Sequence, residues 1–267
     1  MVHKSEAYTH RDVGVALTGP GEMILGGLQA EVTLLLPVHN EADTIELVIN
    51  EFYEELRLKI LPKIVVVEDG STDGTKEILA ELKDRIPMRL ILGSERRGYA
   101  QAILEGLKHV DTEYVLFTDS DGQHAATDFW KLYRQREDYD IINGWRVRRA
   151  DSIFRRLMSS TFQWLARQLF RLSLHDITAP YKLTRSEVAQ TVASEYEYMR
   201  ESFWTEFMIR ALKKGYTVKE VPVTHKKRQS GSTRVYKPLK IPGIIYRQLT
   251  DLIRLWWNTR GRREDHV

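Results

Sequence analysis

The chain has 267 residues, 42% of them hydrophobic, with a formal net charge of +3. This is enough apolar material for the core of one large domain or two small ones. The sequence contains no cysteine, which excludes a disulfide framework and a thiolate metal site and is compatible with a reducing compartment. No apolar leader opens the chain and no run of about 18 apolar residues occurs in it, so we expect no bilayer-spanning segment.

The basic residues are unevenly distributed. Seven arginines and a single acid, Asp151, lie between Arg146 and Arg171, and basic residues again dominate from Arg228 to Arg263. Patches of this kind favour the phosphates of a nucleotide, a nucleic acid or a lipid head group. No nucleic-acid-binding motif accompanies them, so we expect no nucleic-acid partner and favour a nucleotide or a lipid.

The hydrophobic pattern predicts an irregular extension over residues 1–30, followed by strands that alternate with helices. Strands are predicted at 32–38, 64–67, 89–92 and 114–118, and helices at 42–61, 75–82 and 99–110. This order predicts an α/β fold with a parallel sheet that is covered by helices on both faces. The alternation fails beyond Asn143-Gly144, where the pattern predicts helices at 153–172, 198–214 and 241–257 and a strand at 217–223.

Two carboxylates end the buried-strand pattern that begins at Tyr114. Asp119 and Asp121 lie one residue apart, with Gln123 close behind. Open α/β sheets bind ligands at the carboxyl ends of their strands. Two hard oxygen ligands so close together suit Mg²⁺ or Mn²⁺, which bind one or two carboxylates and the phosphates of a substrate. A solvated acidic turn is the alternative interpretation.

Three further polar segments are predicted at strand ends or at the start of a helix. In Pro37-Val-His-Asn40-Glu41, the proline ends the strand pairing and the polar pair either meets a base or ribose or caps the next helix. Glu68 and Asp69 are followed by small residues that let the backbone approach a nucleotide, although Asp73 also suits a helix cap. Gly98, beside two arginines, suits a phosphate or a simple turn.

In order and spacing, these segments resemble the family 2 glycosyltransferases, which have the nucleotide-sugar-binding GT-A fold. The resemblance covers residues 32 to about 236 and implies a mostly parallel, Rossmann-like sheet flanked by helices. It also implies that Asp119, Asp121 and Gln123 hold a divalent ion, Mg²⁺ or Mn²⁺, on the donor diphosphate. The residues that would bind the nucleotide sugar are Pro37, Val38, Asn40, Glu41, Glu68, Asp69, Gly98, Asp119, Ser120, Asp121, Arg228 and Arg234.

Within that family the chain looks most like the dolichyl-phosphate mannose synthase branch and its polyprenyl-phosphate glucosyl relatives. The motifs that carry this likeness are Asn143-Gly-Trp-Arg146, Arg155-Arg156-Leu-Met-Ser159, Asp176-Ile-Thr-Ala-Pro-Tyr-Lys182, Val221-Pro-Val223, Arg228 and Gly231-Ser-Thr-Arg234. The likeness implies that Arg146, Arg155, Arg156 and Ser159 hold a lipid phosphate. The chain departs from the branch in having Gln163 for asparagine, Ala179-Pro180-Tyr181 for Ser-Gly-Phe and Arg234 for lysine, so contacts to the sugar could differ from those of a mannose enzyme.

The predicted activity is an inverting, metal-dependent transfer of mannose or glucose from a GDP- or UDP-sugar to a polyprenyl phosphate. We expect Asp121, Arg146, Arg228 and Arg234 to be catalytic. The divalent ion held by Asp121 and the cations Arg228 and Arg234 would meet the charge that develops on the leaving diphosphate, and Arg146 would bind the acceptor phosphate. The acceptor phosphate is already anionic, so little general-base help is needed. We expect peripheral association with the cytoplasmic face of the membrane through Trp256-Trp257 and nearby arginines; a dimer contact is the alternative.

Two other functions are compatible with the same residues. A family 2 enzyme that acts on a glycan or lipid hydroxyl would need a base such as Glu206, for which a helix-surface salt bridge is the alternative interpretation. A non-catalytic, nucleotide-binding membrane scaffold would have no need of the Asp119–Asp121 pair. The predicted domain organisation is an extension at 1–30, a glycosyltransferase domain at 31–236 with its nucleotide-binding half at 31–145 and its acceptor half at 146–236, and an amphipathic interface region at 237–267.

Overall fold

The computed structural model describes residues 16–17, 23–24, 31–147, 153–228 and 241–260, with side chains for 31–147, 158–228 and 242–260. Within the predicted N-terminal extension, strands β1 (Ala16–Leu17) and β2 (Met23–Ile24) pair antiparallel. The predicted domain boundary at 236 falls outside the described residues and stays a prediction. None of the helices described is both long and apolar enough to cross a membrane.

A seven-stranded sheet forms the centre of the molecule, with the strand order β5-β4-β3-β6-β8-β7-β9. Neighbouring strands are parallel except around β8, which runs antiparallel to both β6 and β7. The strands are β3 (Val32–Val38), β4 (Lys63–Glu68), β5 (Arg89–Leu92), β6 (Tyr114–Phe117), β7 (Ile141–Arg146), β8 (Lys182–Arg185) and β9 (Val218–Val223). This mostly parallel sheet confirms the predicted fold class.

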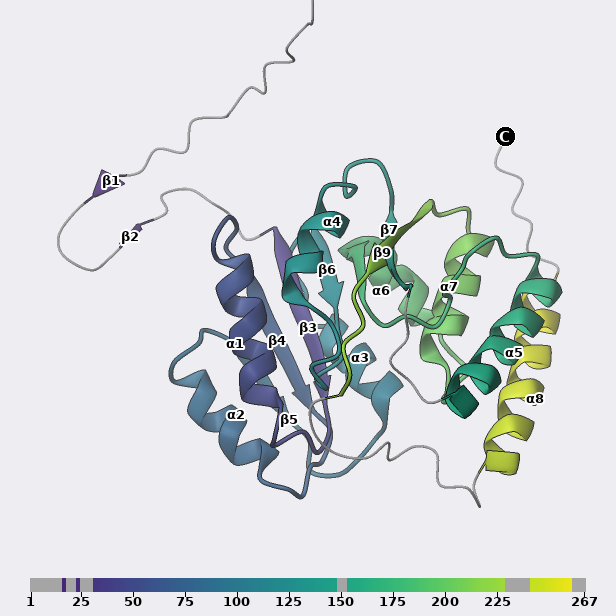
Figure 1. The fold of residues 1–267 in the computed structure, drawn as a ribbon, viewed down its shortest axis with the longest axis horizontal. Coiled ribbons are helices and arrows are strands. Elements are labelled where there is room, and N and C mark those ends of the chain that lie inside the picture. Colours follow the sequence, from purple (N-terminus) through teal and green to yellow (C-terminus); the bar gives the residue numbers. More distant parts are fainter. Residues whose placement is uncertain (1–15, 18–22, 25–30, 148–152, 229–240, 261–267) are drawn as a thin grey trace, which may run out of the picture.

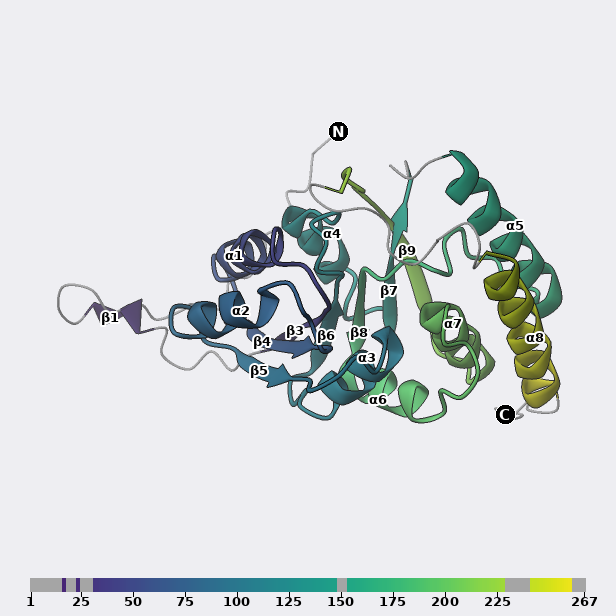
Figure 2. The ribbon, with the colours of Figure 1, turned by 90° about the horizontal axis from the view of Figure 1, so that it is seen from below.

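Helices cover both faces of the sheet (Figures 1 and 2). Helices α1 (Ile45–Leu56), α2 (Thr75–Lys83) and α4 (Phe129–Tyr133) lie on one face, with a short 3-10 turn before α4 at Ala126–Asp128. The other face carries α3 (Tyr99–Leu107), α6 (Ser186–Ser194) and α7 (Phe203–Lys213). At the end of the molecule beyond α7, helices α5 (Ile153–Phe170) and α8 (Ile241–Thr259) lie side by side.

Each face of the sheet has its own hydrophobic core, and β3 contributes to both. Leu34 and Leu36 pack in the core under α1 and α2, whereas Leu35 between them packs in the core under α3. All three leucines are fully buried. A strand that is covered on both faces is apolar at successive positions, which is why its sequence pattern is a continuous run rather than an alternation.

Pro37 ends the strand pairing of β3 on one side only, which corrects the expectation that it ends the ladder altogether. The pairing of β3 with β4 continues to Val38 and Glu68, but its pairing with β6 stops at Leu35 and Phe117. A proline has no N–H to donate toward β6, and its carbonyl instead accepts a hydrogen bond from the Ser120 hydroxyl at 3.0 Å. The sheet therefore opens between β3 and β6, which is the point where its strand order reverses and where such folds bind ligands.

Most predicted elements exist with slightly different ends. Helix α1 is shorter than the predicted 42–61, and α7 begins at Phe203 rather than at 198. Strands β7 and β8 and helix α6 were not predicted.

Candidate active site

The polar segments predicted from the sequence meet at one edge of the sheet. Strand β3 is parallel to β4 and β6, and both β6 and β7 are antiparallel to β8. The carboxyl ends of β3, β4, β6 and β7 therefore point the same way. The loops after these strands carry the predicted donor acids, and Arg146 ends β7. The predicted donor acids Asp69, Asp119 and Asp121 and the predicted acceptor residue Arg146 thus share one edge.

Asn40 ties the loop after β3 to the loop after β4. Its backbone lies in the left-handed region, with φ of 56°, a conformation that asparagine tolerates better than most residues. The Asn40 N–H donates to the Ser71 hydroxyl at 2.8 Å, and its side-chain oxygen accepts from the Thr72 N–H at 2.7 Å. The helix-cap interpretation of Asn40 and Glu41 is wrong, because Thr44 is the residue that precedes α1.

The Asp69 carboxylate holds the loop that leads into α3. It is buried, and its two oxygens accept hydrogen bonds from the backbone N–H groups of Arg97 at 2.6 Å and Gly98 at 2.8 Å. Gly98 has φ of 99°, so it adopts a conformation that other residues rarely take. Glu68 is also buried and accepts from the Ser71 N–H, with Lys76 3.7 Å from its other oxygen.

Asp119 and Asp121 repel one another at the end of β6. The Asp119 carboxylate accepts a hydrogen bond from the Tyr99 hydroxyl at 2.9 Å, and Asp121 accepts one from the Gln123 N–H at 3.1 Å. Burial and the charge of Asp121 raise the pKa of Asp119 to about 7. A bound cation would relieve this repulsion and favour the ionised pair.

The donor set at this point fits a hard divalent cation that also binds substrate phosphates. The Gln123 amide nitrogen donates to the Lys226 carbonyl at 3.0 Å, so the amide oxygen is the atom left for a ligand role. In the described part of the chain, no group of three or more His, Cys, Asp or Glu side chains is placed to hold a metal. Two carboxylates and one amide are what Mg²⁺ or Mn²⁺ takes when phosphate oxygens complete its shell.

The segment after β9 carries Arg228 to the donor side of the edge. Its backbone lies against the loop after β6, where the Lys226 N–H donates to the Gln123 carbonyl at 2.7 Å and His225 forms a bridge with His124. Arg228 then pairs with Glu41. Burial raises the pKa of Glu41 in spite of this arginine, which opposes the shift. Arg234 lies outside the described residues.

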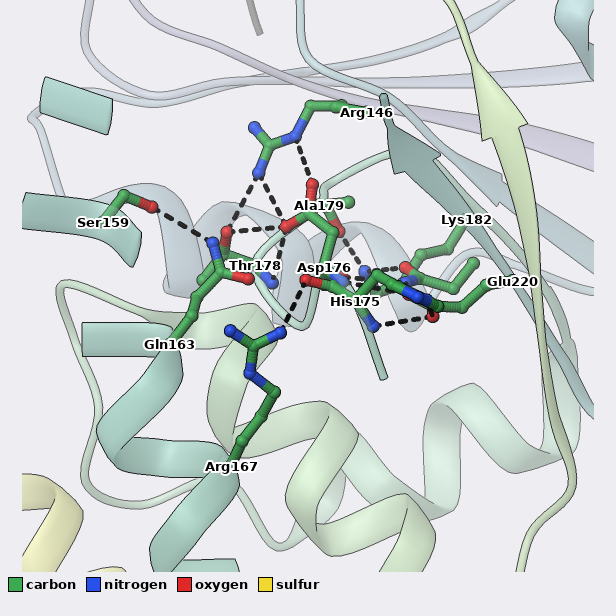
Figure 3. A network of polar contacts seen from close by, with 11 residues as sticks. Arg146, Ser159, Gln163, Arg167, His175, Asp176, Thr178, Ala179, Lys182 and Glu220 are labelled. Carbon is green, nitrogen blue, oxygen red and sulfur yellow. Dashed lines mark hydrogen bonds and ion pairs between the residues drawn. The ribbon is translucent and has the colours of Figure 1, made fainter. Parts of the chain in front are cut away.

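The buried carboxylate of Asp176 holds Arg146. Asp176 belongs to one of the motifs that carry the family resemblance, but the sequence alone assigned it no role. The Nε and Nη2 atoms of Arg146 lie 2.7 and 3.0 Å from the two oxygens of Asp176, and Nη2 also donates to the Thr178 hydroxyl at 2.9 Å (Figure 3). The two side chains of the ion pair are only 8% and 4% exposed. The positive charge of Arg146 opposes the rise in the pKa of Asp119 that burial and Asp121 cause.

A second layer of polar contacts fixes Asp176. Glu220 accepts from the Asp176 N–H at 3.0 Å, and the Asn143 amide donates to the Asp176 carbonyl at 2.8 Å. Lys182, which is fully buried, donates to the Asn143 side-chain oxygen at 2.7 Å. These groups come from β7, β8, β9 and the loop before β8, which are distant from one another in the sequence. A local sequence pattern therefore does not predict this network.

Helix α5 carries the remaining predicted acceptor residues. Ser159 accepts a hydrogen bond from the Gln163 amide at 3.2 Å, and Arg167 on the same helix donates to the carbonyls of Leu174 and His175 (Figure 3). This face of α5 therefore borders the loop that contains Asp176 and Thr178. The side chains of Arg155 and Arg156 lie outside the described residues.

Glu206 occupies a different environment from the one that its sequence context suggested. It is completely buried, and its oxygens accept from the backbone N–H groups of Glu197, Tyr198 and Met199 at 2.7–2.9 Å. Arg210 donates to it at 2.8 Å. Glu206 is thus a buried structural acceptor, neither a surface salt bridge nor a base in an open site.

Comparison with known proteins identifies the family of this chain. The family model "Glycosyl transferase family 2" matches residues 33–192. Glycosyltransferase AglJ of Haloferax volcanii is 30% identical over 82% of this chain and 70% of its own length, and an undecaprenyl-phosphate 4-deoxy-4-formamido-L-arabinose transferase of Edwardsiella ictaluri is 29% identical over 83% and 67%.

Solved structures share the fold. Glucosyl-3-phosphoglycerate synthase of Mycobacterium tuberculosis, in complex with Mn²⁺, UDP and phosphoglyceric acid, has a TM-score of 0.61 at 16% identity over 84% of this chain and 78% of that one. Mannosyltransferase PcManGT of Pyrobaculum calidifontis, in complex with GDP-Man and Mn²⁺, has a TM-score of 0.59 at 20% identity over 85% and 65%. With its GT-A fold and its family match, the chain belongs to glycosyltransferase family 2.

Proposed function

We propose that the protein transfers a hexose, mannose or glucose, from a GDP- or UDP-sugar to a polyprenyl phosphate with inversion at the anomeric carbon. The observation that carries this proposal is that Arg146, which ends β7, and Asp119, which follows β6, lie at the same edge of the sheet. This arrangement would bring an anion-binding group of the acceptor half to the edge that carries the donor acids. An undecaprenyl-phosphate sugar transferase among the relatives supports the same class of acceptor.

In the proposed reaction, an oxygen of the lipid phosphate attacks the anomeric carbon of the donor. The bond from that carbon to the diphosphate breaks, and the nucleoside diphosphate leaves with the electron pair. Asp119, Asp121 and Gln123 would hold the divalent ion, Mg²⁺ or Mn²⁺, which supplies positive charge to the leaving diphosphate. Arg228 and Arg234 would add positive charge there, and Arg146, Arg155, Arg156 and Ser159 would hold the attacking phosphate.

The nucleotide would lie between the loops that follow β3 and β4. Pro37, Val38, Asn40, Glu41, Glu68, Asp69, Gly98 and Ser120 would form its binding surface, since the contacts of Asn40 and Asp69 give these loops a fixed shape. Transfer to a hydroxyl is less well supported. It needs a general base, and Glu206 is buried with its oxygens bound to backbone N–H groups and Arg210.

The acceptor would be met at the cytoplasmic face of a membrane, where α5 and α8 supply the contact surface. Trp164, Tyr246, Ile253 and Trp257 on these helices are each more than half exposed. Arg247 and Arg254 are exposed along α8, and Arg260 is exposed directly after its end. Exposed aromatic side chains with arginines beside them favour the head-group layer of a bilayer, so we infer peripheral binding.

A donor panel tests the proposal. The enzyme is incubated with GDP-mannose, UDP-glucose or other nucleotide sugars, together with polyprenyl phosphate and Mg²⁺ or Mn²⁺. We expect one donor to give a glycosylated lipid, and we expect excess chelator, Asp119→Ala or Asp121→Ala to abolish the product. Full turnover in excess chelator would contradict the metal-dependent mechanism. Absence of lipid product with every donor tested would contradict the proposed acceptor.

A further inference from the structure

The Asp119 carboxylate has a partner that lies outside the motifs considered so far. Tyr99, the first residue of α3, donates its hydroxyl hydrogen to Asp119 at 2.9 Å. The indole N–H of Trp204 on α7 donates to the same Tyr99 hydroxyl at 2.8 Å. The two rings pack edge to face, with centroids 6.5 Å apart. Three segments that are distant in the sequence therefore meet in one chain of hydrogen bonds that ends on a predicted metal ligand.

The direction of these hydrogen bonds is determined by the chemistry of the donors. An indole N–H can only donate, so the Tyr99 oxygen must accept from Trp204. A phenol carries a single hydrogen, and with its oxygen oriented by Trp204 that hydrogen is directed to the carboxylate of Asp119. Trp204 therefore orients the hydroxyl, and the hydroxyl orients Asp119.

Trp204 is itself rigidly placed. It is 5% exposed and packs edge to face against Phe117, the last residue of β6, with centroids 4.9 Å apart. It also packs against Phe203 and Phe207 on its own helix. Since Phe117 lies two residues before Asp119, the tryptophan contacts the same strand whose end carries the carboxylate.

The backbone that carries Tyr99 is fixed as well. The preceding residues Arg97 and Gly98 donate their N–H groups to Asp69, on the nucleotide side of the site. One short segment, 97–99, thus connects the acid predicted to face the nucleotide with the acid predicted to hold the metal. Asp69 thus holds the two residues that precede Tyr99, and Trp204 donates to the Tyr99 hydroxyl.

We propose that Tyr99 is a positioning residue, whose Trp204-oriented hydroxyl holds the Asp119 carboxylate in the orientation that receives the divalent ion of the donor diphosphate. This inference rests on the proposed metal-dependent function. Partners of a metal ligand typically contribute about 10- to 100-fold to metal affinity, because they restrict the ligand to the productive orientation. Tyr99→Phe, which removes only the hydroxyl, should therefore weaken Mn²⁺ binding in the presence of nucleotide by about that factor.

The test measures Mn²⁺ binding directly, by electron paramagnetic resonance titration of the full-length protein with GDP or UDP present. Tyr133→Phe is the matched control, because the Tyr133 hydroxyl also donates to a carboxylate, that of Glu31, which precedes the opposite end of β3. We expect Tyr99→Phe to weaken Mn²⁺ binding and raise the KM for the nucleotide sugar, with the KM for polyprenyl phosphate unchanged and the protein folded at the assay temperature. Tyr133→Phe should leave Mn²⁺ binding unchanged.

A second variant separates positioning from packing. Trp204→Phe keeps an aromatic ring but removes the N–H that orients the hydroxyl, and it should weaken Mn²⁺ binding in the same direction by a smaller factor. Wild-type Mn²⁺ affinity in Tyr99→Phe would overturn the inference while leaving the proposed function intact. Failure of the wild-type protein to bind Mn²⁺ with either nucleotide would overturn the metal-dependent function, and the inference with it.

Discussion

The carboxylates of this protein differ in what their oxygens contact, and this difference separates structural acids from candidate catalytic ones. Asp69 and Glu206 accept hydrogen bonds from backbone N–H groups, and these bonds fix the nearby loops. Asp119 instead lies beside Asp121, and its pKa is raised. All four are simply acids in the sequence, so a sequence pattern predicts where they lie but not which of these two environments each one has.

The environment of Glu206 predicts a loss of stability rather than a loss of chemistry. Glu206→Gln breaks a buried ion pair with Arg210 and should lower the free energy of unfolding by about 3–5 kcal/mol. At a temperature where the variant is folded, turnover should remain appreciable. Chemical denaturation measures the free energy of unfolding, and steady-state kinetics measures turnover. Glu81→Gln, at an exposed position of α2, is the control. Normal stability combined with abolished activity would support a base in a hydroxyl-acceptor reaction instead.

Lys182 predicts a pH-dependent stability. Burial lowers its pKa from 10.5 to about 7 in the folded protein. At a pH between these two pKa values, Lys182 binds more protons in the unfolded chain than in the folded one. Its contribution to the free energy of unfolding therefore increases with pH, by at most about 1.4 kcal/mol per pH unit. Urea denaturation of the wild type and Lys182→Met from pH 7 to about 9 tests this. The free energy of unfolding of the wild type minus that of Lys182→Met should rise with pH. A difference that does not change with pH would disprove the lowered pKa of Lys182.

Among the strands of the seven-stranded sheet, the sequence pattern identifies those with apolar burial more readily than those that bury polar side chains. The β3 to β6 strands were predicted because they are runs of apolar residues with helices between them. Strands β7 and β8 were not predicted because they bury Asn143, Lys182 and Thr184. Asn143 and Lys182 are compatible with a core because they bond one another and also bond the carbonyls of Asp176 and Ala179. Asn143 and Lys182 come from different strands, so a local pattern does not reveal their pairing.

The paired helices α5 and α8 predict membrane binding with two components. Burial of apolar side chains is insensitive to salt, whereas attraction of the arginines to anionic lipid is screened. Flotation with anionic liposomes should therefore show binding that weakens with salt without disappearing. The double variant Trp164→Ser, Trp257→Ser should reduce binding strongly, whereas Leu58→Ser, an exposed leucine just beyond α1, should not. Absence of association at low salt would refute a membrane-binding surface.

For the molecule as a whole, the topology predicted the location of the site but not its internal contacts. Parallel strands bring their carboxyl ends to one edge, so the segments around Asn40, Asp69 and Asp119 were expected to meet. The contacts that orient them come from other parts of the chain. Asp176 pairs with Arg146, Arg228 pairs with Glu41, and Tyr99 binds Asp119. Such pairings depend on how distant segments pack, and single-sequence periodicity carries no information about them.

In the proposed reaction, donor acids and acceptor cations at this edge join a sugar to a lipid phosphate. The most direct measurement is the linkage and anomeric configuration of the product, determined by NMR after incubation with the active nucleotide sugar and an equimolar mixture of polyprenyl phosphate and polyprenol. We expect a single glycosyl phosphodiester of inverted configuration, formed from polyprenyl phosphate alone and absent with Asp121→Ala. A sugar attached to the polyprenol hydroxyl, or a product with retained configuration, would contradict the proposed reaction.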